Sequence, residues 1–241
     1  MKRWNAPDMM NIGQKLFAKI YRKQRYARHN HDSHILAREI DVWLPSGIQA
    51  MIDGSYTPRH LKRRYFPDEM IDQLYLPDRI LQHILLKQIK PTIQHVTNPN
   101  CLHTFGPHGV QIATQRIREA LKEEQPQYLI RADVKSFYKS IVHDKLIADI
   151  KKTYDDPKLI HMLEEIIRNP IETKRGYKNA ITGIALRGPL SQFFGALYLK
   201  SLDDAFDAMQ VTYIRYMDGT PVQAWNKWGE SPLAPISYSG A

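Results

Sequence analysis

The spacing of apolar residues along the chain predicts several amphipathic helices. Near the N-terminus, four apolar residues fall on one short helical face: Leu16, Phe17, Ile20 and Tyr21. A longer helix is expected to open at Pro77 and to close at Pro91, with apolar residues at helical spacing between them. Further helices are expected around residues 110–121, 145–151 and 158–168, and from Pro189 onward.

Other stretches have the pattern of β-structure. Strands, hairpins or β-ribbons are expected at residues 51–67, 128–134, 171–186 and 211–217. In the second of these, Ile130, Ala132 and Val134 share one face of a strand. Helices and strands are mixed without strict alternation, which favours an α+β fold. Residues 220–241 show neither period, so we expect this tail to be atypical and poorly ordered.

Composition narrows the classes of function. The 241-residue chain carries a formal net charge of +9, which fits a polyanionic partner such as nucleic acid. Its single cysteine, Cys101, excludes an internal disulfide framework. The first residues lack a signal-peptide core, and no apolar run is long enough to span a membrane, so we expect a cytoplasmic protein with no membrane partner.

Two aspartates stand at or near the ends of apolar strands. Asp133 follows the first strand and Asp218 the second, 85 positions later (218 minus 133). A carboxylate in this position is costly unless it is paired or bound to a cation. If the two strands lie side by side, the carboxylates converge and supply hard oxygen ligands for Mg²⁺. The alternative is that each aspartate only caps a turn.

The segments around these aspartates resemble motifs of reverse transcriptases. YIRYMDG (213–219) resembles the Tyr-x-Asp-Asp motif, and RADVKSFYKSI (131–141) looks like the first catalytic motif. GIALRGPLSQFFGALYLKSLDDAF (183–206) is similar to the segment and helix between them, and LPDRILQHILL and FGPHG fit the upstream fingers motifs of group II intron and related bacterial enzymes. The ordered motifs cover residues 60–219, about two thirds of the chain.

This resemblance implies a right-hand polymerase fold with fingers and palm. The fingers would take residues 1–125 with an N-terminal extension, the palm 126–219, and no thumb would follow in 220–241. The implied reaction is RNA-directed DNA synthesis, in which the 3′-hydroxyl of a DNA or RNA primer on an RNA template attacks a deoxynucleoside triphosphate.

The resemblance also assigns site residues. Asp133 and Asp218 would be catalytic and would hold two Mg²⁺ ions, or Mn²⁺, together with the Val134 carbonyl. Tyr138 would stack beneath the deoxyribose and exclude a 2′-hydroxyl, the alternative being a core aromatic. The nucleotide-binding residues implied in this way are Tyr138, Phe137, Arg79, Gly188, Pro189 and Ser191. The nucleic-acid-binding residues implied are Arg59, Lys62, Arg63 and Arg64, in a segment whose alternative is a solvated basic loop.

The sequence departs from the family pattern in four places, one of which is the FGPHGV stretch, where the arginine often found beside its glycine is missing. Gly219 stands where the second aspartate of the motif is usual, and Ala185, Leu186 and Arg187 replace the usual Pro, Gln and Gly. The tail after residue 219 also changes character, which suggests a frameshifted or truncated reading frame, and we expect weak or no activity from this chain alone.

Two other classes of function stay open. One is a non-catalytic RNA-binding remnant or subunit, and the other is an unrelated carboxylate-pair hydrolase. The sequence does not distinguish a group II intron, a retron or a phage-defence parent, and it does not indicate an oligomeric state.

Overall fold

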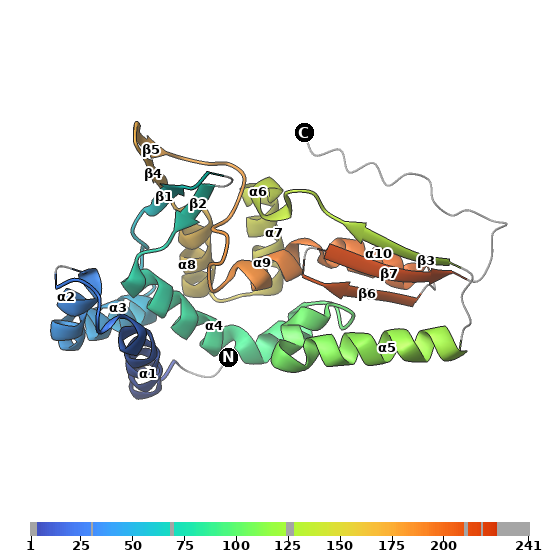
Figure 1. The fold of residues 1–241 in the computed structure, drawn as a ribbon, viewed down its shortest axis with the longest axis horizontal. Coiled ribbons are helices and arrows are strands. Elements are labelled where there is room, and N and C mark those ends of the chain that lie inside the picture. Colours follow the sequence, from blue (N-terminus) through green and yellow to red (C-terminus); the bar gives the residue numbers. More distant parts are fainter. Residues whose placement is uncertain are drawn as a thin grey trace. The chain divides into compact units, whose positions relative to one another are not determined.

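The computed structural model describes residues 4–29, 31–67, 70–123, 128–209, 212–217 and 219–225. The chain forms two compact units, each built from two separate segments (Figure 1). Unit 1 comprises Met1–Val96 and Ser136–Tyr198, and unit 2 comprises Thr97–Lys135 and Leu199–Ala241. The division into fingers and palm at residue 125 stays a prediction. The mixture of helices and small sheets is the α+β class expected from the sequence.

Unit 1 contains most of the helices and a four-stranded sheet. Its helices are α1 (Ala6–Gln24), α2 (Asp32–Arg38), α3 (Ile40–Asp53), α4 (Leu76–Val96), α6 (Phe137–Ser140), α7 (His143–Thr153), α8 (Pro157–Ile167) and α9 (Ser191–Tyr198). Its strands are β1 (Leu61–Tyr65), β2 (Met70–Gln73), β4 (Ile171–Thr173) and β5 (Gly176–Lys178), in the sheet order β2-β1-β4-β5. The loop or β-ribbon expected over residues 51–67 is confirmed in part: β1 pairs antiparallel with β2, but β2 lies beyond residue 67 and residues 51–53 belong to α3. The hairpin expected over 171–186 is shorter, because β5 ends at Lys178.

The prediction that Pro91 closes helix α4 was wrong. The helix continues through Pro91 to Val96. A proline inside a helix removes one backbone hydrogen bond. Here Ile89 and Ile93, on either side of the proline, are both buried, and the Thr92 hydroxyl donates to the Ile89 carbonyl at 2.7 Å. Burial of the last turn therefore stabilises the helix by more than Pro91 destabilises it.

Unit 2 is a three-stranded antiparallel sheet with two helices against it. Its elements are the 3₁₀ helix η1 (Leu102–His108), α5 (Gly109–Glu123), β3 (Tyr128–Asp133), α10 (Lys200–Ala208), β6 (Thr212–Tyr216) and β7 (Gly219–Trp225). The strand order is β3-β7-β6, and helices α5 and α10 both contact β6 (Figure 1). The expected strands at 128–134 and 211–217 are confirmed as β3 and β6.

The expectation of an irregular tail was wrong for residues 220–225. These residues belong to β7, which is the middle strand of the sheet and pairs with strands on both sides. Pro221 conceals the strand in the sequence, since proline cannot donate to a ladder and is confined to edges and bulges. Both ladders are irregular between Gly219 and Val222, where Pro221 lies. Residues 226–241 lie outside the described residues.

Candidate functional site

The predicted site residues fall into two groups, one in each unit. Asp133 and Val134 belong to unit 2, together with Gly219. Tyr138, Arg79 and the other predicted nucleotide- and nucleic-acid-binding residues belong to unit 1.

In unit 2, the end of β3 meets the start of β7. Asp133 and Gly219 are paired across the β3–β7 ladder, and Gly219 is also paired with Tyr216 of β6. The strands that carry the two motifs are therefore not adjacent as expected from the sequence, because β7 lies between them. Asp218 lies outside the described residues, but its neighbour Gly219 is the partner of Asp133.

The Asp133 carboxylate is exposed at this strand end. It makes no hydrogen bond or ion pair with another described residue. Carboxylate and carbonyl oxygens are the ligands that Mg²⁺ prefers, so the Asp133 side chain and the Val134 carbonyl fit a hard cation. Across the described ranges, no group of three or more His, Cys, Asp or Glu residues could hold a metal ion. The role of Asp218 as a metal ligand stays a prediction, since this residue lies outside the described ranges.

The turn immediately before Asp218 is fixed by hydrogen bonds to the N–H and to the carbonyl of a single residue, Met217. Met217 has a backbone φ of 59°, a left-handed conformation that costs a residue with a side chain about 1–2 kcal/mol. Its N–H donates to His103 Nδ1 at 3.0 Å, and its carbonyl accepts from Arg215 Nη1 at 2.9 Å. These two contacts fix the direction in which the chain enters position 218.

Arg215 is itself held by a buried ion pair. Its guanidinium donates to both carboxylate oxygens of Asp203, at 2.7 and 2.6 Å, and the Tyr213 hydroxyl donates to the same carboxylate. The exposed fractions of the Arg215 and Asp203 side chains are 2% and 0%. Burial acts to lower the pKa of Arg215, but its hydrogen bonds to Asp203 and its electrostatic interactions with Cys101, Asp203 and Tyr213 together outweigh this effect, and the pKa is raised above its ordinary value. Burial and the Asp203 charge raise the pKa of Tyr213, which stays a neutral donor.

This network was missed in the sequence, although it leaves a signal there. Arg215 sits in the middle of the apolar strand 211–217, and Asp203 lies on the same helical face as Phe206. A lone cation in an apolar strand and a lone anion on an apolar helix face together predict a buried pair, since each is costly alone.

In unit 1, the predicted aromatic pair of Phe137 and Tyr138 packs against Gly195 of helix α9. Phe137 is buried and Tyr138 half-buried, with ring centroids 5.2 Å apart. A Cβ at Gly195 of α9 would lie 3.0 Å from Phe137 Cε1 and 3.6 Å from Tyr138 Cε1. Glycine at this position therefore lets α9 approach the aromatic pair closely.

The loop before α9 is hydrogen-bonded to the same segment. Gly183 N–H donates to the Ile141 carbonyl at 2.8 Å, and Ile184 N–H donates to the Tyr138 carbonyl at 2.9 Å. His143 Nε2 donates to the Gly183 carbonyl at 2.6 Å, which places its proton on Nε2 because a carbonyl only accepts. Two sequence motifs, around 138 and around 188, are thus joined within unit 1.

The loop ends in a tight turn at the predicted nucleotide-binding residues. Gly188 N–H donates to the Ala185 carbonyl at 3.1 Å, and the buried Ser191 hydroxyl donates to the Gly188 carbonyl. Arg187 has a φ of 66°, and its side chain is exposed.

A cavity of about 600 Å³ gathers three arginines beside this turn. Arg64 of β1, Arg79 of α4 and Arg187 line it together with Gly188. Arginine binds phosphate oxygens through several donors at once. The cavity brings together Arg64, Arg79 and Gly188 of the predicted site, whereas Tyr138, Pro189 and Ser191 do not line it.

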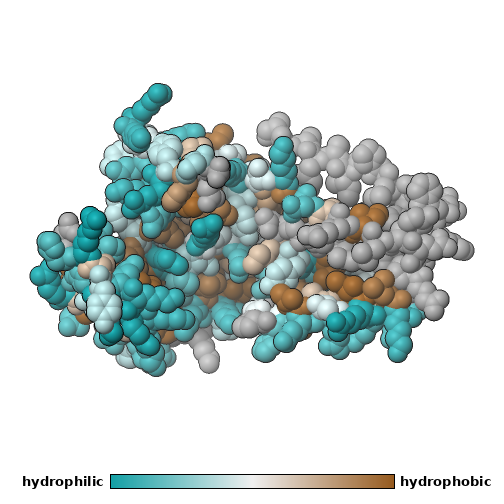
Figure 2. Space-filling view, viewed as in Figure 1, coloured by the Kyte–Doolittle hydropathy of each residue, from teal (hydrophilic) through white to brown (hydrophobic). Residues whose placement is uncertain are grey.

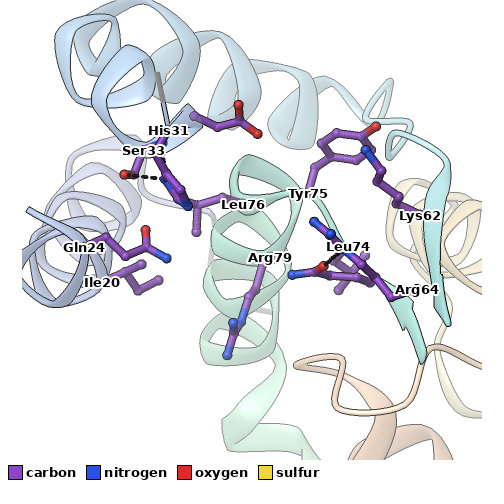
Figure 3. Close-up of a pocket in the computed structure, with 12 residues that line it drawn as sticks. Ile20, Gln24, His31, Ser33, Lys62, Arg64, Leu74, Tyr75, Leu76 and Arg79 are labelled. Carbon is purple, nitrogen blue, oxygen red and sulfur yellow. Dashed lines mark hydrogen bonds between the residues drawn. The ribbon is translucent and has the colours of Figure 1, made fainter. Parts of the chain in front are cut away.

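The four predicted nucleic-acid-binding residues differ in their surroundings. Arg63 donates to both oxygens of the Asp72 carboxylate, at 2.8 and 2.9 Å, so its guanidinium is already engaged. Lys62 and Arg64 line a second cavity, of about 200 Å³, between β1, α1 and α2 (Figure 3). The exposed Arg59 lies with its guanidinium carbon 5.8 Å from the centre of the Tyr75 ring.

Comparison with solved structures identifies the fold. The chain matches a chain of a partial Cas6-RT-Cas1–Cas2 complex with a TM-score of 0.53 and 17% identity, over 92% of this chain and 38% of that one. A match to a Cas6-RT-Cas1–Cas2 complex has the same score and identity and covers 24% of the longer chain. The fold is reverse-transcriptase-like.

A weaker likeness is to the telomerase from Candida albicans in complex with a TWJ fragment of telomeric RNA. It has a TM-score of 0.45 and 11% identity over 71% of this chain and 39% of that one, and no argument below depends on it. No protein-family description and no curated protein matches the sequence. The chain spans well under half the length of the solved chains that it resembles.

None of the helices in the described part of the chain is long and apolar enough to cross a membrane.

Proposed function

We propose that the chain is an RNA-directed DNA polymerase that extends a primer 3′-hydroxyl with deoxynucleoside triphosphates on an RNA template. The observation that carries this proposal is the pairing of Asp133 with Gly219, the residue directly after Asp218. The reverse-transcriptase-like fold and the ordered motifs support it. The basic net charge of +9 fits a nucleic-acid substrate.

In this proposal the residues of unit 2 hold the cations. Asp133, Asp218 and the Val134 carbonyl would bind two Mg²⁺ ions, for which Mn²⁺ could substitute. When bound, the ions activate the primer hydroxyl and stabilise the leaving pyrophosphate. The Met217 turn, fixed by Arg215 and His103, would orient Asp218 toward Asp133.

The residues of unit 1 would bind the nucleotide. Arg64, Arg79 and Arg187 line a cavity large enough for a triphosphate and would bind its phosphate oxygens. Tyr138, together with Phe137, would support the sugar and exclude a 2′-hydroxyl. The turn formed by Gly188, Pro189 and Ser191 would lie against the nascent base pair.

Gly219 lowers the expected rate, since it supplies no carboxylate where the motif usually has a second aspartate. Fewer anionic ligands leave more of the cation charge uncompensated and weaken its binding. We therefore expect activity to require a higher Mg²⁺ concentration than a site with three carboxylates, and restoration by Gly219→Asp.

The experiment is primer extension on an RNA template with deoxynucleotides and Mg²⁺ or Mn²⁺. The chain is compared with Asp133→Ala and with the control Asp155→Ala, an exposed aspartate in the loop before α8. We expect extension by the chain and the control, and a loss of at least about 100-fold in Asp133→Ala, since removal of one electrostatic catalytic group typically costs 10²–10³.

Absence of extension by the chain and by Gly219→Asp would contradict the proposal. If RNA binding were retained in that case, the chain would be a non-catalytic RNA-binding protein. Equal activity of Asp133→Ala and Asp155→Ala would show that Asp133 is not a metal ligand.

A further inference from the structure

Helix α4 carries one uncharged polar side chain into the apolar interior of unit 1. Hydrophilic side chains cover much of α1–α3 at the surface (Figure 2), whereas the inner side of α4 includes Ile80, Ile84 and Leu85, which are fully buried. Gln82 lies on the same helix, and its exposed fraction is 2%. A buried amide is costly unless its donors and its acceptor are hydrogen-bonded, so each polar atom of Gln82 is expected to have a partner.

The amide nitrogen of Gln82 lacks such a partner within the described part of the chain. The Nε2 atom is buried and makes no hydrogen bond of ordinary geometry. The side chain does lie near the Tyr56 hydroxyl: burial and the neighbouring Asp78 raise the pKa of Tyr56, and Gln82 acts to lower it. That hydroxyl donates to Asp78 Oδ1 at 2.8 Å, so Asp78 is its main partner. Because a glutamine amide has two N–H donors, at least one of them remains for another group.

Gln82 lines a small cavity beside the turn at Gly188. The cavity has a volume of about 20 Å³. Gln82 borders it from α4, and Ala185, Gly188 and Ser191 border it from the turn, while its other lining residues are apolar. A polar site needs about 10–15 Å³ to hold one water molecule. The cavity therefore has room for one water molecule and little more.

The turn has two acceptor oxygens close together. The Gly188 carbonyl accepts from the Ser191 N–H at 3.2 Å and from the Ser191 hydroxyl, so both of its lone pairs are used. The Ala185 carbonyl accepts from the Gly188 N–H at 3.1 Å and has a second lone pair, and the Ser191 hydroxyl oxygen can itself accept. A Cβ at Gly188 would lie 3.1 Å from the Ala185 oxygen and 3.6 Å from Ser191 Oγ. Both oxygens therefore flank the space that a side chain at position 188 would take.

We propose that the cavity binds one water molecule, which accepts a hydrogen bond from the Gln82 amide and donates to the Ala185 carbonyl and the Ser191 hydroxyl. Ordered water with two to four polar partners is the usual way in which a buried polar group without a protein partner is satisfied. The bridge makes Gln82 a positioning residue, because it joins helix α4 to the turn without contacting the nucleotide. The role of the turn in nucleotide binding rests on the proposed function, whereas the bridge itself does not.

The bridge supports a turn whose backbone is strained. Arg187 lies between Ala185 and Gly188 and has a φ of 66°, a left-handed conformation that is unfavourable for a residue with a side chain. A conformation of this kind persists only where the surrounding contacts hold it. Arg187 and Gly188 also line the cavity of about 600 Å³ assigned to the triphosphate. Loss of the bridge would therefore loosen two residues of the nucleotide site together.

The test compares Gln82→Met with the control Gln94→Met. Methionine has about the length of glutamine but no N–H group, so Gln82→Met removes the bridge while the interior of unit 1 stays filled. Gln94 is exposed on the same helix, so the same substitution there leaves the cavity unchanged. Because Gln82→Met also relieves the burial of an amide, its free energy of unfolding is expected to stay close to that of the unchanged chain.

The first measurement is amide hydrogen exchange at Gly188 and Ser191, followed by NMR in the absence of any substrate. Both N–H groups are donors within the turn. Exchange should be about 2- to 13-fold faster in Gln82→Met, from the 0.5–1.5 kcal/mol that one hydrogen bond contributes, and unchanged in Gln94→Met. The Gly183 N–H, which donates to the Ile141 carbonyl, is the internal reference and should exchange alike in all three chains.

The second measurement is the extension of a primer by a single nucleotide. The KM for the deoxynucleoside triphosphate should rise in Gln82→Met by a factor similar to that of the exchange rate. The kcat should stay within about twofold, since Gln82 acts on binding through the turn and contacts no reacting atom. Faster exchange with an unchanged KM would overturn the positioning role.

A crystal structure at high resolution tests the water itself. One ordered water is expected within hydrogen-bond distance of the Gln82 amide and the Ser191 hydroxyl, and an ordered turn without this water would overturn the bridge. Equal exchange of Gly188 in Gln82→Met and Gln94→Met would also overturn it, as would an equal acceleration at Gly183, which would make Gln82 a general structural residue. The exchange experiment needs no polymerase activity, so the bridge and the proposed function can fail separately.

Discussion

At the scale of single residues, the most consequential contact is the ion pair between Arg215 and Asp203. The two side chains are almost fully buried, and Arg215 also holds the Met217 carbonyl. Arg215→Met leaves the Asp203 carboxylate buried without its cation, and loss of one partner of a buried pair costs about 3–5 kcal/mol. Urea denaturation of the variant should show this loss in the free energy of unfolding.

The control for this prediction is the exposed pair Arg168–Asp144. The exposed fractions of these side chains are 45% and 81%, with the nitrogen and oxygen 2.7 Å apart. Arg168→Met should therefore cost less than about 1 kcal/mol. Similar small losses in both variants would show that the buried pair does not support unit 2.

His143 makes the stability of unit 1 depend on pH. Burial lowers the pKa of His143 from its ordinary value of 6.5, and burial also lowers the pKa of His83. Below about pH 6.5 the unfolded chain therefore binds a proton at this histidine more readily than the folded protein does. The free energy of unfolding is highest above about pH 6.5 and decreases as the pH falls from there toward the lowered pKa.

The measurement is the free energy of unfolding from pH 7.5 to pH 5. His143→Gln keeps an amide donor for the Gly183 carbonyl but does not titrate, so the pH dependence should shrink and a residual slope from His83 should remain. An unchanged slope in His143→Gln would show that this histidine does not carry the effect.

At the scale of elements, β7 decides whether the sheet of unit 2 exists. It is the middle strand, so β3 and β6 have no common ladder without it. A chain that ends after Asp218 should lose protection from amide hydrogen exchange in β3 and β6, because isolated strands are unstable in water. A chain that ends after Trp225 keeps all of β7 and should retain that protection.

The helices of unit 1 provide the internal reference for this experiment. Helices α4 and α7 belong to the other unit and should stay protected in both shortened chains. Persistent protection of β3 in the chain that ends after Asp218 would contradict the role assigned to β7.

Helices and strands with a clear periodicity of apolar residues could be predicted from the sequence. Elements stabilised by residues far away in the sequence could not. Strand β3 and helix α8 follow from alternation and helical spacing in their own residues. Strand β7 does not, because Pro221 interrupts its pattern and its ladders to β3 and β6 supply the stability that its sequence lacks. For the same reason, the end of α4 was predicted too early at Pro91.

The candidate site was predictable to a similar extent. Asp133 at a strand end and Arg79 on a helix could be singled out from local pattern and resemblance. The ion pair between Arg63 and Asp72 could not be predicted, because it depends on the register of β1 against β2. The hydrogen bond from Met217 to His103 joins residues 114 positions apart, and no local pattern encodes it.

At the scale of the whole molecule, the chain passes between its two units three times. It leaves unit 1 after Val96, returns at Ser136 and leaves again after Tyr198. Each unit is therefore closed by contacts between residues far apart in the sequence. A pass along the sequence meets each unit twice, and the predicted division into fingers (1–125) and palm (126–219) stays a prediction.

The central position of β7 has a consequence for synthesis of the protein on the ribosome. Strand β3 emerges about 90 residues before β7, its only partner in the sheet, so its edges stay unpaired while the nascent chain lengthens. Unpaired strand edges are open to pairing with other chains. The strand that bears Asp133 can therefore be completed only by one of the last described segments to be translated, and slow elongation through residues 134–219 would prolong the period in which newly made chains can aggregate.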